Sequence, residues 1–182
     1  MTHGIYAGVF DPLTRGHWSV IESGVDLFDE FTIGIGVNPG KNPMFSPEER
    51  KSIISDSIAE KMRYYHDSFH GASSLKKVAK LGSIKIEFFD NEFLVKFAEK
   101  IGAKFVLRGI RDNEDFRQEQ TYNFFNRQIA PDIQTVYVMP DPKYSAVSSS
   151  AIKSMIGPNG WHSVIQPYLT EPAYNRIMEK FK

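Results

Sequence analysis

The sequence contains no cysteine among its 182 residues. This absence excludes disulfide bonds, thiolate metal sites and a cysteine nucleophile, and it favours a reducing compartment. The N-terminus lacks the basic and then apolar pattern of a signal peptide, and no apolar run approaches the roughly 20 residues that span a bilayer. We therefore expect a cytoplasmic protein with no membrane partner.

The sequence also lacks an excess of charge of either sign. Lys plus Arg and Asp plus Glu both number 22, so the formal net charge is zero. A chain with this balance has no overall attraction to nucleic acid or to an acidic partner, although a local basic site is compatible with it. We expect a protein that does not bind nucleic acid.

The sequence does contain enough apolar material for one core, with 41% hydrophobic and 24% charged residues. A chain of this length can bury one substantial core and is short for two. No internal repeat, linker or low-complexity tract divides it. We therefore expect a single domain over residues 1–182.

Short apolar runs alternate with amphipathic runs along the chain. Five apolar runs have the length and composition of buried strands, at 4–10, 31–37, 83–89, 104–107 and 135–139. Helical patterns lie between and after them, at about 18–28, from 46 onward, and at 91–100, 112–129, 148–157 and 161–181. Because strands that alternate with helices form right-handed crossovers, the predicted fold is α/β, a doubly wound five-stranded parallel sheet with C-terminal helices.

Residues 63–82 fit this pattern less well. They lengthen the connection between the second helix and the third strand, and the middle of the segment is small and polar. Such a segment buries little apolar area. We interpret it as a surface insertion that is mobile or rests on a neighbouring subunit.

The loop at 11–17 joins the first strand to the first helix. Thr14 can cap that helix, Gly16 leaves its first turn bare, and His17 projects from a turn whose free N–H groups attract an anion. These features suit a phosphate. Taken alone, they are slightly more typical of an ordinary helix cap with a packed histidine.

Three other strand ends carry groups that suit phosphate. Lys41 follows the second strand, and Arg108 and Arg111 follow the fourth. The serines of 148–150 follow the fifth strand and would open a helix. Each group has a plain alternative, such as ion pairs of the arginines with Glu114 or Asp115. Because the four loops meet at one edge of the sheet, together they predict a polyphosphate site.

Several familiar sites are missing. No G-x-G-x-x-G follows the first strand, and the P-loop pattern fails because Ile35 replaces its first glycine and Asn42 its Ser or Thr. There is no G-x-S-x-G elbow. His66 and His70 stand four residues apart without an evident third ligand, so we interpret them as surface histidines. Dinucleotide-dependent hydride transfer, P-loop hydrolysis and ester hydrolysis are therefore disfavoured.

Five segments carry a resemblance to a known family. They are GVFDPLTRGH, NPGKNPMFSPEER, LRGIRDNEDFRQE, NFFNRQIAPDIQTVYVMP and YSAVSSSAIK, in this order over most of residues 4–155. Together they resemble the bacterial phosphopantetheine adenylyltransferases, within the nucleotidyltransferase superfamily marked by (H/T)-x-G-H. The resemblance implies a Rossmann-like fold and transfer of AMP from ATP to 4′-phosphopantetheine, giving dephospho-coenzyme A and pyrophosphate. It also implies Mg²⁺ as cofactor and a homo-oligomer, usually a hexamer.

The resemblance also implies roles for individual residues. It implies a catalytic role for His17, Lys41 and Arg108, with His17 contacting the phosphate under attack. It implies ATP contacts at Gly8, Phe10, Thr14, His17, Arg111, Glu119, Tyr144, Val147, Ser148, Ser149 and Ser150. It implies contacts to the acceptor substrate at Val9, Lys41, Phe93, Leu94 and Arg108, and it implies no metal ligand from the protein.

The sequence departs from the family pattern at a few positions. Val9 replaces a Thr or Ser whose hydroxyl contacts the substrate phosphate, Gln118 stands where an aromatic residue is common, and Tyr144 takes the place of a tryptophan. Three alternatives to the implied function stay open. One is a related nucleotidyltransferase that acts on another phosphorylated acceptor, and the second is a catalytically weak nucleotide-binding module. The third, which the ordered match of five segments makes remote, is an unrelated α/β protein whose basic loops bind an acidic partner.

The implied reaction agrees with the residues that are present. The nucleophile is a phosphate oxygen that is already anionic near neutral pH, so the reaction needs no general base. It needs alignment of the two substrates and neutralisation of the charge that builds on the reacting phosphates. A histidine, a lysine and an arginine at one sheet edge can supply both.

Overall fold

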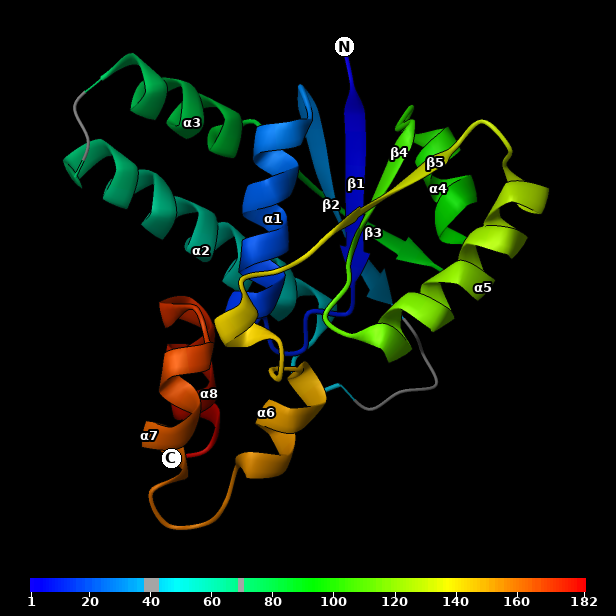
Figure 1. Cartoon of the computed structure of the whole chain (residues 1–182). Coiled ribbons are helices and arrows are strands. Elements are labelled where there is room, and N and C mark those ends of the chain that lie inside the picture. The colour runs from blue at the N-terminus through cyan, green and yellow to red at the C-terminus, as the bar shows by residue number, and fades with distance from the viewer. Residues whose placement is uncertain (38–42, 69–70) are drawn as a thin grey trace.

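A sheet of five parallel strands forms the centre of the molecule (Figure 1). The computed structural model describes residues 1–37, 43–68 and 71–182. The strand order is β3-β2-β1-β4-β5, and every neighbouring pair is parallel. The doubly wound sheet predicted from the sequence is confirmed. The strands are β1 (His3–Gly8), β2 (Glu30–Val37), β3 (Lys85–Asp90), β4 (Phe105–Gly109) and β5 (Gln134–Val138).

The direction of winding reverses between β1 and β4. The chain runs outward from β1 through β2 to β3, and then returns to add β4 and β5 on the other side of β1. Because β1 and β4 pair directly, with Tyr6 opposite Leu107, the loops that follow them leave the same edge of the sheet. Ligands of doubly wound sheets bind at this point.

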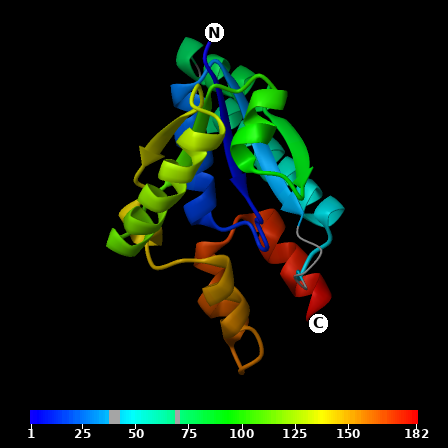
Figure 2. The same ribbon diagram turned by 90° about the vertical axis from the view of Figure 1, so that its right-hand side faces the viewer.

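Helices cover both faces of the sheet. α1 and α2 share a large apolar core with the C-terminal helices, and α4 packs on a smaller core around Ile5 and Val106. Figure 2 shows α6, α7 and α8 beyond the carboxyl ends of the strands. No helix within the described ranges is long and apolar enough to cross a membrane. The helices are α1 (Arg15–Leu27), α2 (Pro47–Ser68), α3 (Ala72–Gly82), α4 (Leu94–Lys100), α5 (Asn113–Ile129), α6 (Ser149–Met155), α7 (Trp161–Ile165) and α8 (Glu171–Lys180).

The first helix is formed as its sequence predicts. Trp18, Ile21 and Val25 share one face and are almost completely buried, as the helical spacing of apolar residues requires. Phe28 at its C-cap lies against β1, where a Cβ on Gly4 would come within 2.4 Å of the ring. Glycine on the strand therefore allows the helix end to approach the sheet closely.

The structure corrects two predicted boundaries near the sheet edge. β1 ends at Gly8 and not at residue 10, because Phe10 has a φ of 53° and turns the chain away from the sheet. α4 begins at Leu94 and not near 91, because Asn91 has a φ of 51°, which a right-handed helix cannot contain. Both corrections place Val9 and Phe93 in connecting loops.

Residues 63–82 are largely helical. α2 continues to Ser68, and α3 then packs back along α2. The Lys80 ammonium donates to the carbonyls of Val25 and Phe28 at 2.9 Å each, and Leu81 is buried. The segment is thus tied to the end of α1, although most of its side chains are exposed. That it is an insertion stays a prediction.

Candidate active site

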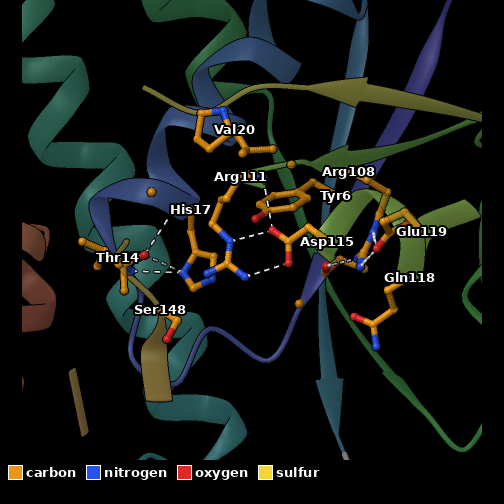
Figure 3. Close-up of a pocket in the computed structure, with 16 residues that line it drawn as sticks. Tyr6, Thr14, His17, Val20, Arg108, Arg111, Asp115, Gln118, Glu119 and Ser148 are labelled. Atoms are coloured by element: carbon orange, nitrogen blue, oxygen red, sulfur yellow. Dashed lines mark hydrogen bonds and ion pairs between the residues drawn. The ribbon is translucent and has the colours of Figure 1, made fainter. Parts of the chain in front are cut away.

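A cavity of about 300 Å³ lies at the sheet edge where β1 and β4 end (Figure 3). Its walls come from the loop after β1, the start of α1, the end of β4, α5 and the connection that follows β5. Sequence segments that are far apart thus meet at one place, as the strand order requires. The predicted site residues among its walls are Gly8, Thr14, His17, Arg108, Arg111, Glu119, Val147 and Ser148.

Thr14 and His17 cap each other at the start of α1. The Thr14 hydroxyl accepts the backbone N–H of His17 at 3.3 Å, and the Thr14 backbone N–H donates to Nδ1 of His17 at 3.1 Å. Nδ1 is therefore an acceptor, so the proton of the neutral ring is on Nε2. Burial, aided by the charge of Arg111, lowers the pKa of His17 to about 4. At neutral pH His17 is an uncharged hydrogen-bond donor.

Arg108 on β4 forms an ion pair with Glu119 on α5. Its Nε donates to Oε1 of Glu119 at 2.8 Å, a second guanidinium nitrogen contacts the same oxygen, and a third reaches the carbonyl of Ala7 at 3.4 Å. Burial opposes the charge of Arg108, but the hydrogen bond and charge of Glu119 outweigh it and raise the arginine pKa. The predicted catalytic arginine and the predicted ATP contact are thus partners.

Arg111 forms a two-pronged ion pair with Asp115, one turn along α5. The two N···O distances are 2.8 and 3.0 Å. The hydrogen bond to Asp115 raises the pKa of Arg111 and lowers that of Asp115. This pair is one of the plain alternatives considered for the sequence, yet both residues also line the cavity. Arg108 pairs with neither Glu114 nor Asp115.

The segment of Ser148, Ser149 and Ser150, called the serine loop below, lies beside the cavity. Its hydroxyl groups make different hydrogen bonds. Ser148 caps α6 by accepting the N–H of Ala151 at 3.1 Å, and it lines the cavity. The Ser149 hydroxyl donates to the carbonyl of Pro12 at 2.9 Å and so joins this loop to the loop after β1. Three predicted ATP contacts of this region do not line the cavity: Tyr144, Ser149 and Ser150.

Phe10 is buried and packs against two residues that line the cavity. Its side chain is only 1% exposed and meets the rings of Tyr6 and His17 edge-on, at centroid distances of 5.4 and 5.3 Å. An ATP contact at this residue would therefore involve its backbone. Sequence reasoning missed Tyr6, which lines the cavity and whose pKa is raised to about 12 by burial. In the sequence it looks like any other apolar residue of a buried strand.

The predicted acceptor residues occupy two further hollows. Val9 and Phe93 line one of about 540 Å³ at the ends of β1, β2 and β3. Phe93 and Leu94 line another of about 390 Å³ between α4 and α5, together with Arg108 and Glu119. Because Arg108 and Glu119 also line the first cavity, they form a shared wall between two neighbouring spaces. Lys41 lies outside the described residues.

The site offers little to a metal ion. In the described part of the chain, no three His, Asp or Glu side chains gather closely enough to hold one. The two carboxylates nearest the cavity, Glu119 and Asp115, already bind arginines. These side chains therefore do not form a set of ligands that could hold a metal ion by themselves.

Comparison with known proteins gives a consistent result. The sequence profile of the cytidylyltransferase-like family matches residues 5–155. The phosphopantetheine adenylyltransferase of Chromobacterium violaceum is 36% identical over 181 residues, which is 100% of this chain and 98% of the relative. The one of Caldanaerobacter subterraneus subsp. tengcongensis is 32% identical over 183 residues, with 100% and 99% covered.

Solved structures resemble the fold at low sequence identity. A Plasmodium falciparum nicotinic acid mononucleotide adenylyltransferase complexed with APC superposes with a TM-score of 0.66 at 14% identity, covering 100% of this chain and 98% of that one. A putative nicotinate-nucleotide adenylyltransferase from Vibrio parahaemolyticus gives 0.57 at 16% identity, covering 98% and 99%. At these identities the likeness shows the fold alone.

Proposed function

Because the chain belongs to the cytidylyltransferase-like family and, within it, to the phosphopantetheine adenylyltransferases, we propose that it transfers AMP from ATP to 4′-phosphopantetheine. The products are dephospho-coenzyme A and pyrophosphate, in a step of coenzyme A biosynthesis. The observation that carries the proposal is the cavity between β1 and β4, where a neutral histidine and two charged arginines face one space. Such a space suits a triphosphate.

The reaction is an exchange of one phosphorus–oxygen bond for another. A phosphate oxygen of phosphopantetheine attacks the α-phosphorus of ATP, a new P–O bond forms, and the bond to the β-phosphate breaks as pyrophosphate leaves. The nucleophile already carries negative charge, so no side chain has to remove a proton. The protein's task is to align the two phosphates and to neutralise the charge that develops between them.

His17 meets this need as a fixed donor. Its ring is held by Thr14 through Nδ1, and its Nε2–H is left to bind an oxygen of the α-phosphate. A neutral donor costs less to bury than an imidazolium and stays in one protonation state across the physiological range. The N-terminus of α1 adds free N–H groups at the same point.

Arg108 and Arg111 would neutralise the charge of different phosphate groups. Arg108 lies on the wall between the cavity and the hollow beside α4 and α5, so it can contact phosphates of both substrates. Arg111 faces only the ATP cavity among these spaces and suits the departing pyrophosphate. Each begins the cycle paired with a carboxylate, Glu119 or Asp115, which holds the guanidinium in place before a phosphate arrives.

The hollow between α4 and α5 suits the rest of the acceptor. Its walls are mainly apolar, and Phe93, Leu94 and Tyr122 contribute to them. A pantetheine arm is a long chain of methylene and amide groups, which such walls can cover. This proposal also explains why Arg108, at the inner end of the hollow, would meet the acceptor's phosphate.

Mg²⁺ belongs to the proposal as a partner of the substrate. Magnesium commonly binds nucleotide phosphates and keeps several waters, and it needs few protein ligands. Its contribution would be to neutralise charge on the ATP phosphates. The residues derived above act independently of where it binds.

We further propose that the protein is a cytoplasmic homo-oligomer, a hexamer by resemblance to the family. Support comes from Phe116 and Phe124 on α5, which are 44% and 61% exposed and line neither the ATP cavity nor the acceptor hollow. A contact between subunits would cover such apolar side chains. Light scattering coupled to gel filtration would give the number of copies, and a monomer would contradict this part of the proposal.

One assay tests the activity directly. Purified protein with Mg²⁺ should release pyrophosphate from ATP only when phosphopantetheine is present, and mass spectrometry should detect dephospho-coenzyme A. Pantetheine, which has no phosphate, is the matched control acceptor and should be inert. Turnover with nicotinate mononucleotide and not with phosphopantetheine would identify a related nucleotidyltransferase. ATP binding without any transfer would identify a nucleotide-binding module.

A further inference from the structure

The carboxylate of Asp11 is the centre of a buried cluster that the reaction chemistry above does not use. Asp11 is 2% exposed. Its Oδ2 accepts the backbone N–H of Met44 at 2.8 Å, and its Oδ1 accepts the backbone N–H of Phe45 at 2.9 Å. The Lys153 ammonium donates to Oδ2 at 3.0 Å. One side chain thus binds two other parts of the chain.

The partners of Asp11 belong to the segments that carry the predicted site residues. Asp11 lies three residues before Thr14, in the loop that follows β1. Met44 and Phe45 end the connection from β2 to α2, which also contains Lys41. Lys153 lies on α6, whose cap is Ser148. The cluster therefore joins the loop of His17, the connection of Lys41 and the serine loop.

Three further hydrogen bonds reinforce this arrangement. The Ser149 hydroxyl donates to the carbonyl of Pro12 at 2.9 Å, directly beside Asp11. The Arg50 guanidinium, which is buried, donates to the carbonyls of Val9 and Gly36 at 2.7 and 3.0 Å. The loop after β1 is thus held on one side by α6 and on the other by α2.

The charge at Asp11 suggests a role beyond stability. Removing a carboxylate from water is costly, and apolar contacts of similar size often stabilise a protein equally well. A carboxylate differs in that it fixes direction, because its two oxygens select particular N–H groups. Lys153 is also 37% exposed along its side chain, so its replacement leaves no large cavity. The Asp11–Lys153 pair is therefore suited to holding the loop after β1 in a fixed position relative to α6.

We propose that Asp11 and Lys153 are positioning residues for the adenylyl transfer. They fix the loop of His17, which in the proposed function contacts ATP, relative to Met44 and Phe45 before α2 and to α6. Neither residue need touch a substrate. The inference rests on the proposed function for its effect on turnover, whereas the cluster itself can be tested without any substrate.

Hydrogen exchange tests the cluster in the absence of substrates. In Asp11→Asn one carboxylate oxygen becomes an NH₂ group, so at least one of the two backbone amides loses its acceptor. Exchange across Met44 and Phe45 should rise on the order of 10-fold, the effect of one lost charge-assisted hydrogen bond. Lys85→Met, which breaks the Lys85–Glu30 pair at the opposite end of the sheet, should leave this exchange unchanged. Equal exchange in Asp11→Asn and the parent would overturn the proposal.

Steady-state kinetics test the positioning role. Lys153→Met should lower kcat/KM for ATP and for phosphopantetheine together, by roughly 10-fold each, in protein that circular dichroism shows to be folded at the assay temperature. Lys153→Arg should restore most of both values, and Lys85→Met should change neither. Loss for one substrate alone would make Lys153 a binding residue, and parental kinetics in Lys153→Met would refute the role. A parent without transferase activity would contradict the proposed function, while the exchange result would still decide the cluster.

Discussion

Arg108 and Glu119 form an ion pair on the wall shared by two cavities, so the arginine proposed to meet both substrates already has a carboxylate partner within the protein. An arriving phosphate must share the guanidinium with the carboxylate. This arrangement keeps a half-buried arginine charged and correctly placed. In the proposed mechanism Glu119 therefore acts through Arg108 even where it does not touch ATP.

Removing Arg108 alone should cost both stability and activity. Arg108→Ala leaves Glu119 buried and unpaired, which should reduce the free energy of unfolding by roughly 2 kcal/mol. In Arg108→Ala/Glu119→Gln the buried charge is gone, so stability should recover while kcat/KM stays low. Urea unfolding and pyrophosphate release measure the two effects. Recovery of activity in the double variant would show that Arg108 has no role in the reaction.

The neutral state of His17 predicts a specific kinetic defect. His17→Ala removes a donor that binds mainly the charge formed in the transition state, so kcat should fall by roughly 100-fold or more. The Kd for ATP should change little. His66→Ala is a suitable control, because His66 is exposed on α2 and contacts only Asp67 in the described hydrogen bonds. Equal kcat in His17→Ala and the parent would exclude the role.

Burial of His17 also predicts how stability depends on pH. The pKa is about 4 in the folded protein and near 6.5 when the chain is unfolded. Above pH 6.5 both states are neutral and His17 contributes no pH dependence. Between pH 6.5 and 4 only the unfolded state binds the proton, so folding loses stability as the pH falls.

Melting temperatures measure this dependence. Between pH 7 and pH 5 the parent should lose more than His17→Gln, which cannot bind a proton. A His17→Gln variant that loses the same number of degrees as the parent would show that His17 does not account for the slope. The comparison is independent of turnover, so it also holds for a variant that is inactive.

Val9 predicts a gain of function. Its side chain is 42% exposed and lines the hollow at the ends of β1, β2 and β3, which shares Phe93 with the hollow proposed for the acceptor. Val9→Thr adds a hydroxyl at similar volume, and a hydrogen bond to phosphate should raise kcat/KM for phosphopantetheine about 10-fold or more. The KM for ATP should not change. Val9→Ala controls for volume, and a Val9→Thr rate no higher than the parent's would count against a phosphate at this position.

The fold could be predicted from the sequence because its signals are local. The apolar spacing of Trp18, Ile21 and Val25 fixes the buried face of α1. Ser46 and Glu49 have the three-residue spacing of a capping box, and in the structure they cap α2 with N···O distances of 2.7 and 3.1 Å. Both depend on neighbours within one or two helical turns. The alternation of strands and helices then predicts a parallel sheet, whereas the strand order is seen only in the structure.

The site was less predictable because its contacts are not local. Glu119 reaches Arg108 only through the angle at which α5 crosses β4, and no spacing rule favours it over Glu114 or Asp115. The Asp11 cluster joins residues 33 to 142 positions apart. α3 was missed for a different reason, since a polar middle hid a helix whose apolar face is narrow.

The direct pairing of β1 with β4 has a consequence for how the enzyme is made. Arg108 reaches the carbonyl of Ala7 across 101 residues of sequence. A nascent chain that has emerged only as far as β3 can hold β1 and β2 together, but it has no second wall for its nucleotide. Binding competence therefore arrives late in synthesis, after β4, α5 and the connection that follows β5 have closed the cavity. Ribosome-stalled chains ending before β4 and after α6 would show this as the onset of ATP binding.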